Sequence, residues 1–134
     1  MFVIGAAVAV LCMAAGPAHA QTYLSPSAVV ASPDGATLYV AESGANQVAA
    51  VNAADGAVVK TVALSAAPHA LALTADGAKL FVAAGVENGK ILVVDPAAGA
   101  VTAEFAAGHT PSAIVVSADG ATLYVCNRFS NAVG

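Results

Sequence analysis

The feature that most constrains this chain is a repeat of 42 to 43 residues. The stretch DGATLYV occurs at Asp34–Val40 and again at Asp119–Val125, and the variant DGAKLFV lies between them at Asp76–Val82. A proline stands eight residues before each of these aspartates and an asparagine twelve residues after it: Pro26, Pro68 and Pro111, then Asn46, Asn88 and Asn131. A period of this length predicts an array of similar small units.

Within one period, short apolar segments alternate with turn residues. Each segment has four to six residues and is rich in β-branched or aromatic side chains, which favours strands. In the second unit the expected strands are Ala70–Thr74, Lys79–Ala83, Lys90–Asp95 and Val101–Phe105. Asp-Gly and Pro turns join them. Alanine favours helix, but no apolar segment after residue 20 reaches ten residues without a turn residue, so a helical repeat is not expected.

A four-stranded unit of this length is typical of a β-propeller blade. The segments PSAVVASPDGATLYVAESGANQVAAVN and PSAIVVSADGATLYVCNRFSNAVG resemble the YVTN family of propeller repeats. The closest match to the tetrapeptide that names the family is YVCN, with Cys126 in place of threonine. The resemblance runs from about Ser25 to Gly134 and implies an all-β propeller of the surface-layer and cytochrome d-type haem superfamily.

The number of repeats is small for a propeller. The units are expected at about 25–66, 67–109 and 110–134, within a domain over 21–134 of about 2.7 blades. Closed propellers have four to eight blades. We therefore expect the N-terminal part of a seven- or eight-bladed protein whose remaining blades follow. The alternative is a partial propeller that assembles between copies.

The first twenty residues predict export. MFVIGAAVAVLCMAAGPAHA is apolar and ends in a small-x-small motif, which is typical of a signal peptide cleaved after Ala20. The mature protein would be secreted or periplasmic and keep Cys126 as its one thiol, expected to be packed at a strand end. Because no Lys or Arg precedes the apolar segment, an uncleaved signal that anchors the chain in a membrane is the alternative.

The repeated turn residues are expected to be structural, because a catalytic group is normally needed once. This covers Asp34, Gly35, Asp76, Gly77, Asp119 and Gly120. His69 and His109 lie near the starts of first strands, so they are the weak candidates for binding a cofactor; solvent-exposed loop histidines are the alternative. Glu42, Glu87 and Arg128 differ between units and are expected in the loop after the second strand, where ligand specificity would lie.

Composition and motifs limit the function. Four basic against eight acidic residues give a net charge of −4, with no basic cluster for nucleic acid. We find no catalytic constellation, metal motif or haem-attachment motif, and expect no cofactor. The leading hypothesis is a non-catalytic module that binds or scaffolds an unknown protein or small molecule at the cell envelope. The resemblance also allows a redox propeller linked to haem or a quinoprotein and, less favoured, a lactonase-like hydrolase.

Overall fold

The computed structural model describes residues 23–129 and 132–134, and the predicted signal peptide lies outside them. The described chain is all-β, with one short 3-10 helix, η1, at Ser43–Ala45. Its strands are β1 Pro26–Ala31, β2 Thr37–Glu42, β3 Gln47–Asn52, β4 Val58–Ala63, β5 Pro68–Leu73, β6 Leu80–Ala84, β7 Lys90–Asp95, β8 Ala100–Ala106, β9 Pro111–Val116, β10 Leu123–Asn127 and β11 Ala132–Val133.

The strands form three antiparallel sheets that follow the sequence repeat. The first sheet is β1-β2-β3-β4, the second is β5-β6-β7-β8, and the third is β9-β10-β11. The predicted strands of the second unit agree with β5 to β8 within two residues at each end, and the prediction for β7 has the same bounds. Consecutive strands pair because the turns between them are short.

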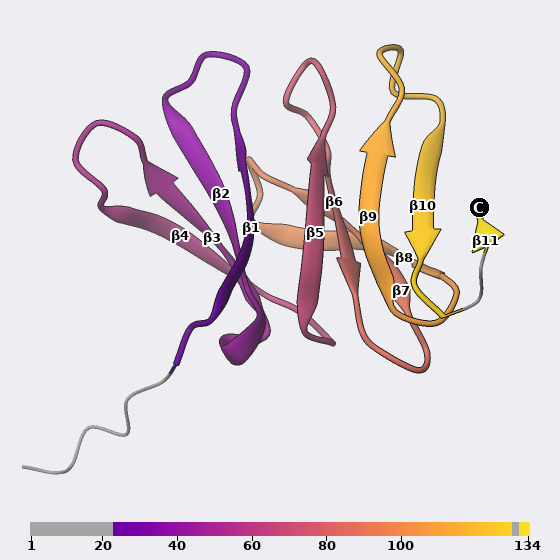
Figure 1. The fold of residues 1–134 in the computed structure, drawn as a ribbon. Helices are drawn as coiled ribbons and strands as arrows, with labels where there is room; N and C mark the ends of the chain where they lie inside the picture. Colours follow the sequence, from indigo (N-terminus) through magenta and orange to yellow (C-terminus); the bar gives the residue numbers. More distant parts are fainter. Residues whose placement is uncertain (1–22, 130–131) are drawn as a thin grey trace, which may run out of the picture.

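The three sheets stand face to face like blades (Figure 1). The first strands of the sheets, β1, β5 and β9, are neighbours, so they form the inner edge of the array. Each sheet then runs outward to its last strand. This arrangement confirms the predicted fold, a β-propeller built from units of about 42 residues, of which part is present.

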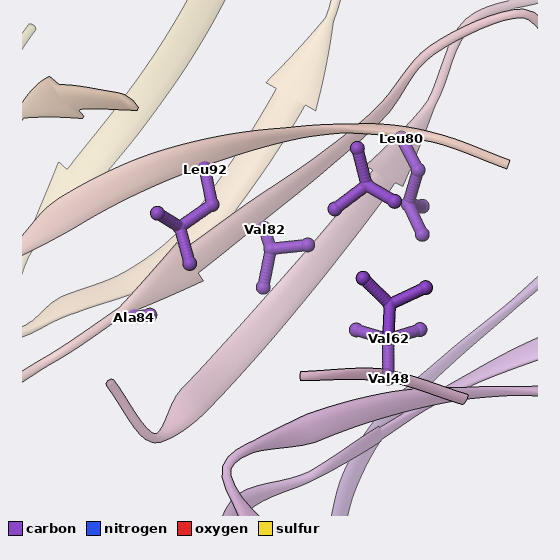
Figure 2. Packing of buried hydrophobic residues seen from close by; sticks show 7 residues of the cluster. Val48, Val62, Leu80, Val82, Ala84 and Leu92 are labelled. Carbon is purple, nitrogen blue, oxygen red and sulfur yellow. The ribbon is translucent and has the colours of Figure 1, made fainter. Parts of the chain in front are cut away.

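Two apolar layers separate the sheets, and β6 contributes to both. Leu80 and Val82 pack with Val48 and Val62 of the first sheet (Figure 2), whereas Phe81 and Ala83 face the third sheet. Successive side chains on a strand point to opposite faces, so the LFV segment fills both layers. The side chains of this segment therefore alternate between the two layers.

Small side chains let the sheets approach closely. Ala72, Ala83 and Ala84 are all buried, and the largest fully buried side chains are Leu80 and Leu92. A core of Val, Leu, Ile and Ala gains its stability from many close contacts rather than from aromatic area.

Cys126 does not follow the sequence expectation. It lies on β10 and is exposed, so the prediction of a packed strand-end thiol is wrong. The reason is its direction: Val125 next to it is buried against the second sheet, and Cys126 therefore points to the opposite face of the third sheet.

Candidate functional site

The blades have two ends with different chemistry. At one end lie the repeated Asp-Gly turns, which join β1 to β2, β5 to β6 and β9 to β10. At the other end the inner strands begin and β2, β6 and β10 finish. The candidate functional site is at this second end, which we call the loop end; it is defined by Ser27, His69, Ser112, Glu42 and Asn127.

In each Asp-Gly turn, the aspartate carboxylate accepts hydrogen bonds from residues of the same turn. Asp76 Oδ1 accepts from the Thr74 hydroxyl at 2.6 Å and from the Ala78 N–H at 3.0 Å. Asp34 and Asp119 accept in the same way from the serine two residues before and the alanine N–H two residues after. Each following glycine has a φ of +71° to +73°, a conformation that favours glycine. The repeated residues thus serve to close the turns.

These hydrogen bonds favour the charged carboxylates. The Ser32 hydroxyl, and then the Ala36 N–H, lower the pKa of Asp34 below its ordinary value. The pKa of Asp76 is lowered first by the Thr74 hydroxyl, and that of Asp119 first by the Ser117 hydroxyl. A general acid at neutral pH needs a raised pKa, so the shifts have the wrong direction for that role.

A hollow of about 260 Å³ lies between the second and third of these turns. It is lined by Thr74, Asp76, Lys79, Asp119 and their small neighbours. The carboxylates that border it already accept hydrogen bonds from their own turns, and we place the candidate site at the other end.

At the loop end, every inner strand has the same irregularity. The pairing of β1 with β2 skips Ser27, that of β5 with β6 skips His69, and that of β9 with β10 skips Ser112. Such a bulge redirects one side chain out of the regular alternation. Three polar side chains therefore occupy equivalent positions at the beginning of the inner strands.

The three bulge residues are not equally satisfied. The Ser27 hydroxyl donates to the Pro68 carbonyl oxygen at 2.9 Å, and Ser112 has a longer contact of 3.4 Å with the Cys126 carbonyl. His69 Nε2 is buried, and no atom of the described residues hydrogen-bonds it. Asn127, at the end of β10, holds a second such atom, Oδ1. Unpaired buried polar atoms are costly and rare, so two at one end of the blades mark an unusual site.

Glu42 is also at this end, but not in a loop. It is the last residue of β2 and only 7% exposed, so the expectation that it lies in the following loop is wrong. Its Oε2 accepts from Gln47 Nε2, across the β2-β3 pair. Its counterparts in the repeat are Ala84 and Asn127, and this position therefore varies between blades.

His109 is at the same end as His69, but its surroundings differ. Its Nδ1 is 2.8 Å from Thr110 Oγ1, and its ring meets Phe129 edge-on at 5.2 Å. Glu87 is in the loop between β6 and β7, and Arg128 follows β10, as the variation between units predicts. The structure thus places both histidines at the loop end. In the part of the chain that it describes, His69 Nε2 has no hydrogen-bond partner, whereas His109 Nδ1 contacts Thr110 Oγ1.

The backbone at this end is strained. Ser25 and Thr110 precede the prolines of β1 and β9, yet have φ values of +46° and +49°. This conformation costs about 1–2 kcal/mol for a residue other than glycine. It directs the Ser25 and Thr110 carbonyls to accept from the N–H groups of Ser43 and Arg128. Such strain concentrates at functional positions.

No family model and no curated protein matches this chain. Among solved structures, it is similar to Kuenenia stuttgartiensis hydrazine synthase, with 34% identity and a TM-score of 0.75 over 80% of this chain and 30% of that one. It is similar to a predicted 6-phosphogluconolactonase from Bacteroides uniformis, with 21% identity and a TM-score of 0.71 over 83% of this chain and 35% of that one. The WD40 repeats of RRP9 give 16% identity and a TM-score of 0.67 over 83% of this chain and 38% of that one.

The chain spans about a third of the length of the proteins it matches. Likeness to the latter two shows the fold alone. The comparisons therefore support a β-propeller architecture. They do not assign the functions of these proteins to this chain.

Sequence reasoning missed Ser27, Ser112 and Asn127. Ser27 and Ser112 are ordinary residues after a proline, and their importance comes from the bulge. The repeat could have drawn attention to this position. When the units are aligned on Pro26, Pro68 and Pro111, the second unit has a histidine where the other two have serine.

Proposed function

We propose that this chain is an exported, non-catalytic propeller module of the YVTN type that binds a polar ligand or partner segment at the loop end. The observation that carries the proposal is the pair of unpartnered buried atoms, His69 Nε2 and Asn127 Oδ1. A ligand that supplies their hydrogen bonds recovers a cost that the free protein bears.

The difference between the two ends of the blades supports a binding role for the loop end. The repeated carboxylates accept hydrogen bonds within their own turns. At the loop end, by contrast, one repeat position holds Glu42, Ala84 and Asn127 in the three units. Binding residues commonly lie on loops that a rigid scaffold positions. His69 Nε2 accepts or donates according to its tautomer, and the Asn127 carbonyl oxygen accepts, so the matching ligand carries at least one N–H or O–H donor.

A thermal-shift screen of the purified chain tests the binding proposal. Glycine, acetamide, imidazole and short peptides serve as the probes, with His69→Leu and Asn127→Leu as variants. We expect a probe that raises the melting temperature of the parent chain and has no effect on either variant. A probe whose effect survives both substitutions would contradict a site at the loop end.

Export is the second part of the proposal and rests on the apolar segment before Gln21. In the described residues, no helix is long and apolar enough to cross a membrane. Expression with the native N-terminus in a bacterial host, followed by N-terminal sequencing of the periplasmic fraction, should give a chain that starts at Gln21. A chain that starts at Met1 and stays with the membrane would support the anchored alternative.

The second candidate function is a propeller linked to a redox cofactor, and the 34% identity to a hydrazine synthase chain favours it. A haem iron would need an imidazole nitrogen, and the candidates in the described residues are His69 and His109. Nδ1 of His109 lies 2.8 Å from Thr110 Oγ1, so Nε2 is the nitrogen of that ring left for ligation. An absorbance spectrum after haem addition tests this candidate: a Soret shift that is lost in His69→Leu or in His109→Leu would favour it, and no shift would count against it.

A further inference from the structure

The Asn127 side chain lies at the boundary between the second and third sheets. Asn127 is paired in register with Pro111, the first residue of β9. Its amide rests on the linker that arrives from β8, because a Cβ added at Gly108 would lie 2.6 Å from Asn127 Cγ. Val125, two residues earlier on β10, packs against the second sheet, and side chains two residues apart on a strand share a face. Asn127 therefore faces the second sheet.

His69 approaches the same boundary from the second sheet. It is the bulge residue of β5, as Ser27 is the bulge residue of β1. The Ser27 hydroxyl donates to the carbonyl of Pro68, which begins the next inner strand. Because the two bulges are equivalent, the His69 side chain is directed toward Pro111, which begins β9. The repeat therefore brings together at Pro111 the two buried atoms without a hydrogen-bond partner in the described residues, His69 Nε2 and Asn127 Oδ1.

Both of these atoms serve as acceptors. Asn127 Oδ1 is a carbonyl oxygen, and His69 Nε2 accepts when the imidazole proton is on Nδ1. Pro111, beside them, has no N–H group that could donate to either atom. A ligand group that satisfies both atoms must therefore carry two donors. A carboxylate, which only accepts hydrogen bonds, does not fit.

The charges near this boundary decide between a cationic and a neutral donor. The Glu104 carboxylate is already paired with Lys90, and Glu87 is exposed in the β6-β7 loop. Arg128 directly follows Asn127 and disfavours a second positive charge. Desolvation of a charge that has no opposite charge beside it costs more than two neutral hydrogen bonds return. A neutral group with two N–H donors is therefore the better fit.

We propose that the loop end binds a neutral carboxamide, the side chain of an asparagine or glutamine in a partner segment, at the boundary between the second and third sheets. One N–H of the carboxamide donates to His69 Nε2 and the other to Asn127 Oδ1. The amide nitrogen carries both donors without a net charge. This inference rests on the proposed function above and adds the chemical class of the ligand.

Three probes of nearly the same shape test the class of the ligand. Acetate, acetamide and acetamidinium differ in charge and in the number of their N–H donors. An NMR titration of the ¹⁵N-labelled chain follows the imidazole nitrogens of His69 and the side-chain amide of Asn127. We expect acetamide to shift both signals and to bind at least about tenfold more tightly than either charged probe. Tighter binding of acetate or acetamidinium at these residues would overturn the carboxamide class and leave the binding role of the loop end standing, whereas no shift with any of the three probes would count against both.

The variant Asn127→Asp tests the assignment without changing the size of the site. A carboxylate of nearly the same shape supplies a negative charge, so the preference should change from acetamide to acetamidinium. Asn46→Asp is the matched control, because Asn46 is an exposed asparagine in the β2-β3 loop, and it should keep the preference for acetamide. An unchanged preference in Asn127→Asp, or the same change in both variants, would overturn the proposal.

Discussion

The Ser27 hydroxyl lies 2.9 Å from the Pro68 carbonyl oxygen and donates to it across the boundary between the first and second sheets. Ser27 is the bulge residue of β1, and Pro68 begins β5. One hydroxyl therefore connects two inner strands at the loop end. The same position in β5 is His69, whose Nε2 has no hydrogen-bond partner within residues 23–129 and 132–134.

We expect Ser27→Ala to lower the free energy of unfolding by about 1 kcal/mol, because a net intramolecular hydrogen bond contributes about this much. Ser112→Ala is the matched control and should change stability little, since the Ser112 contact is 3.4 Å long. Urea unfolding measures both. Equal losses in the two variants would show that the bond from Ser27 does not join the sheets.

Acid should destabilise the fold through the Asp-Gly turns. The pKa values of Asp34, Asp76 and Asp119 are lowered by hydrogen bonds within the folded turns, so their contribution is complete above the ordinary aspartate value of 3.8. Because the unfolded chain binds more protons near that pH, the contribution is lost as pH falls through the lower folded pKa values. The melting temperature should be nearly flat from neutral pH to about pH 5 and fall below about pH 4. Replacing all three aspartates with asparagine should flatten the acid decline; an unchanged decline would place its origin elsewhere.

Substitution of two glycines by alanine distinguishes the energetic cost of a left-handed backbone from the cost of steric crowding by the added Cβ. Gly35 and Gly77 have φ values of +71° and +73°, but a Cβ at Gly35 meets nothing within 4 Å, whereas one at Gly77 lies 3.1 Å from the Pro33 ring. We expect Gly35→Ala to cost about 1–2 kcal/mol through its left-handed backbone, and Gly77→Ala to cost more. Guanidinium unfolding measures the difference. A larger loss for Gly35→Ala would contradict this order.

Replacing His69 should stabilise the free protein. His69→Leu removes a buried nitrogen without a partner, so the free energy of unfolding should rise by about 1 kcal/mol. His109→Leu should lower it, because that ring meets Thr110 Oγ1 and the Phe129 edge. Thermal unfolding of both variants tests the contrast. A stability loss in His69→Leu would indicate that His69 has a structural role.

The fold was predictable from the sequence because the same pattern of turn residues and apolar segments occurs in three successive units. Asp34, Asp76 and Asp119 fix the register, and the alternation around Leu80, Phe81 and Val82 assigns both faces. The site was harder to predict, because the positions of its residues depend on a bulge in each inner strand and on contacts with neighbouring blades. His69 was named as a weak candidate from its position in the repeat, but the sequence could not show that its Nε2 has no hydrogen-bond partner in the described residues. Glu42 and Cys126 were misplaced because strand ends and open sheet faces depend on packing between blades.

Repeated residues close the turns of the blades, and we propose that the polar residues at the loop end bind the ligand. The most direct test is an NMR titration of the ¹⁵N-labelled chain with any probe that passes the thermal-shift screen. We predict amide shifts at Ser27, His69, Ser112 and Asn127, with none at Asp76 and Asp119. Shifts confined to the Asp76 and Asp119 turns, around the hollow they border, would contradict the account.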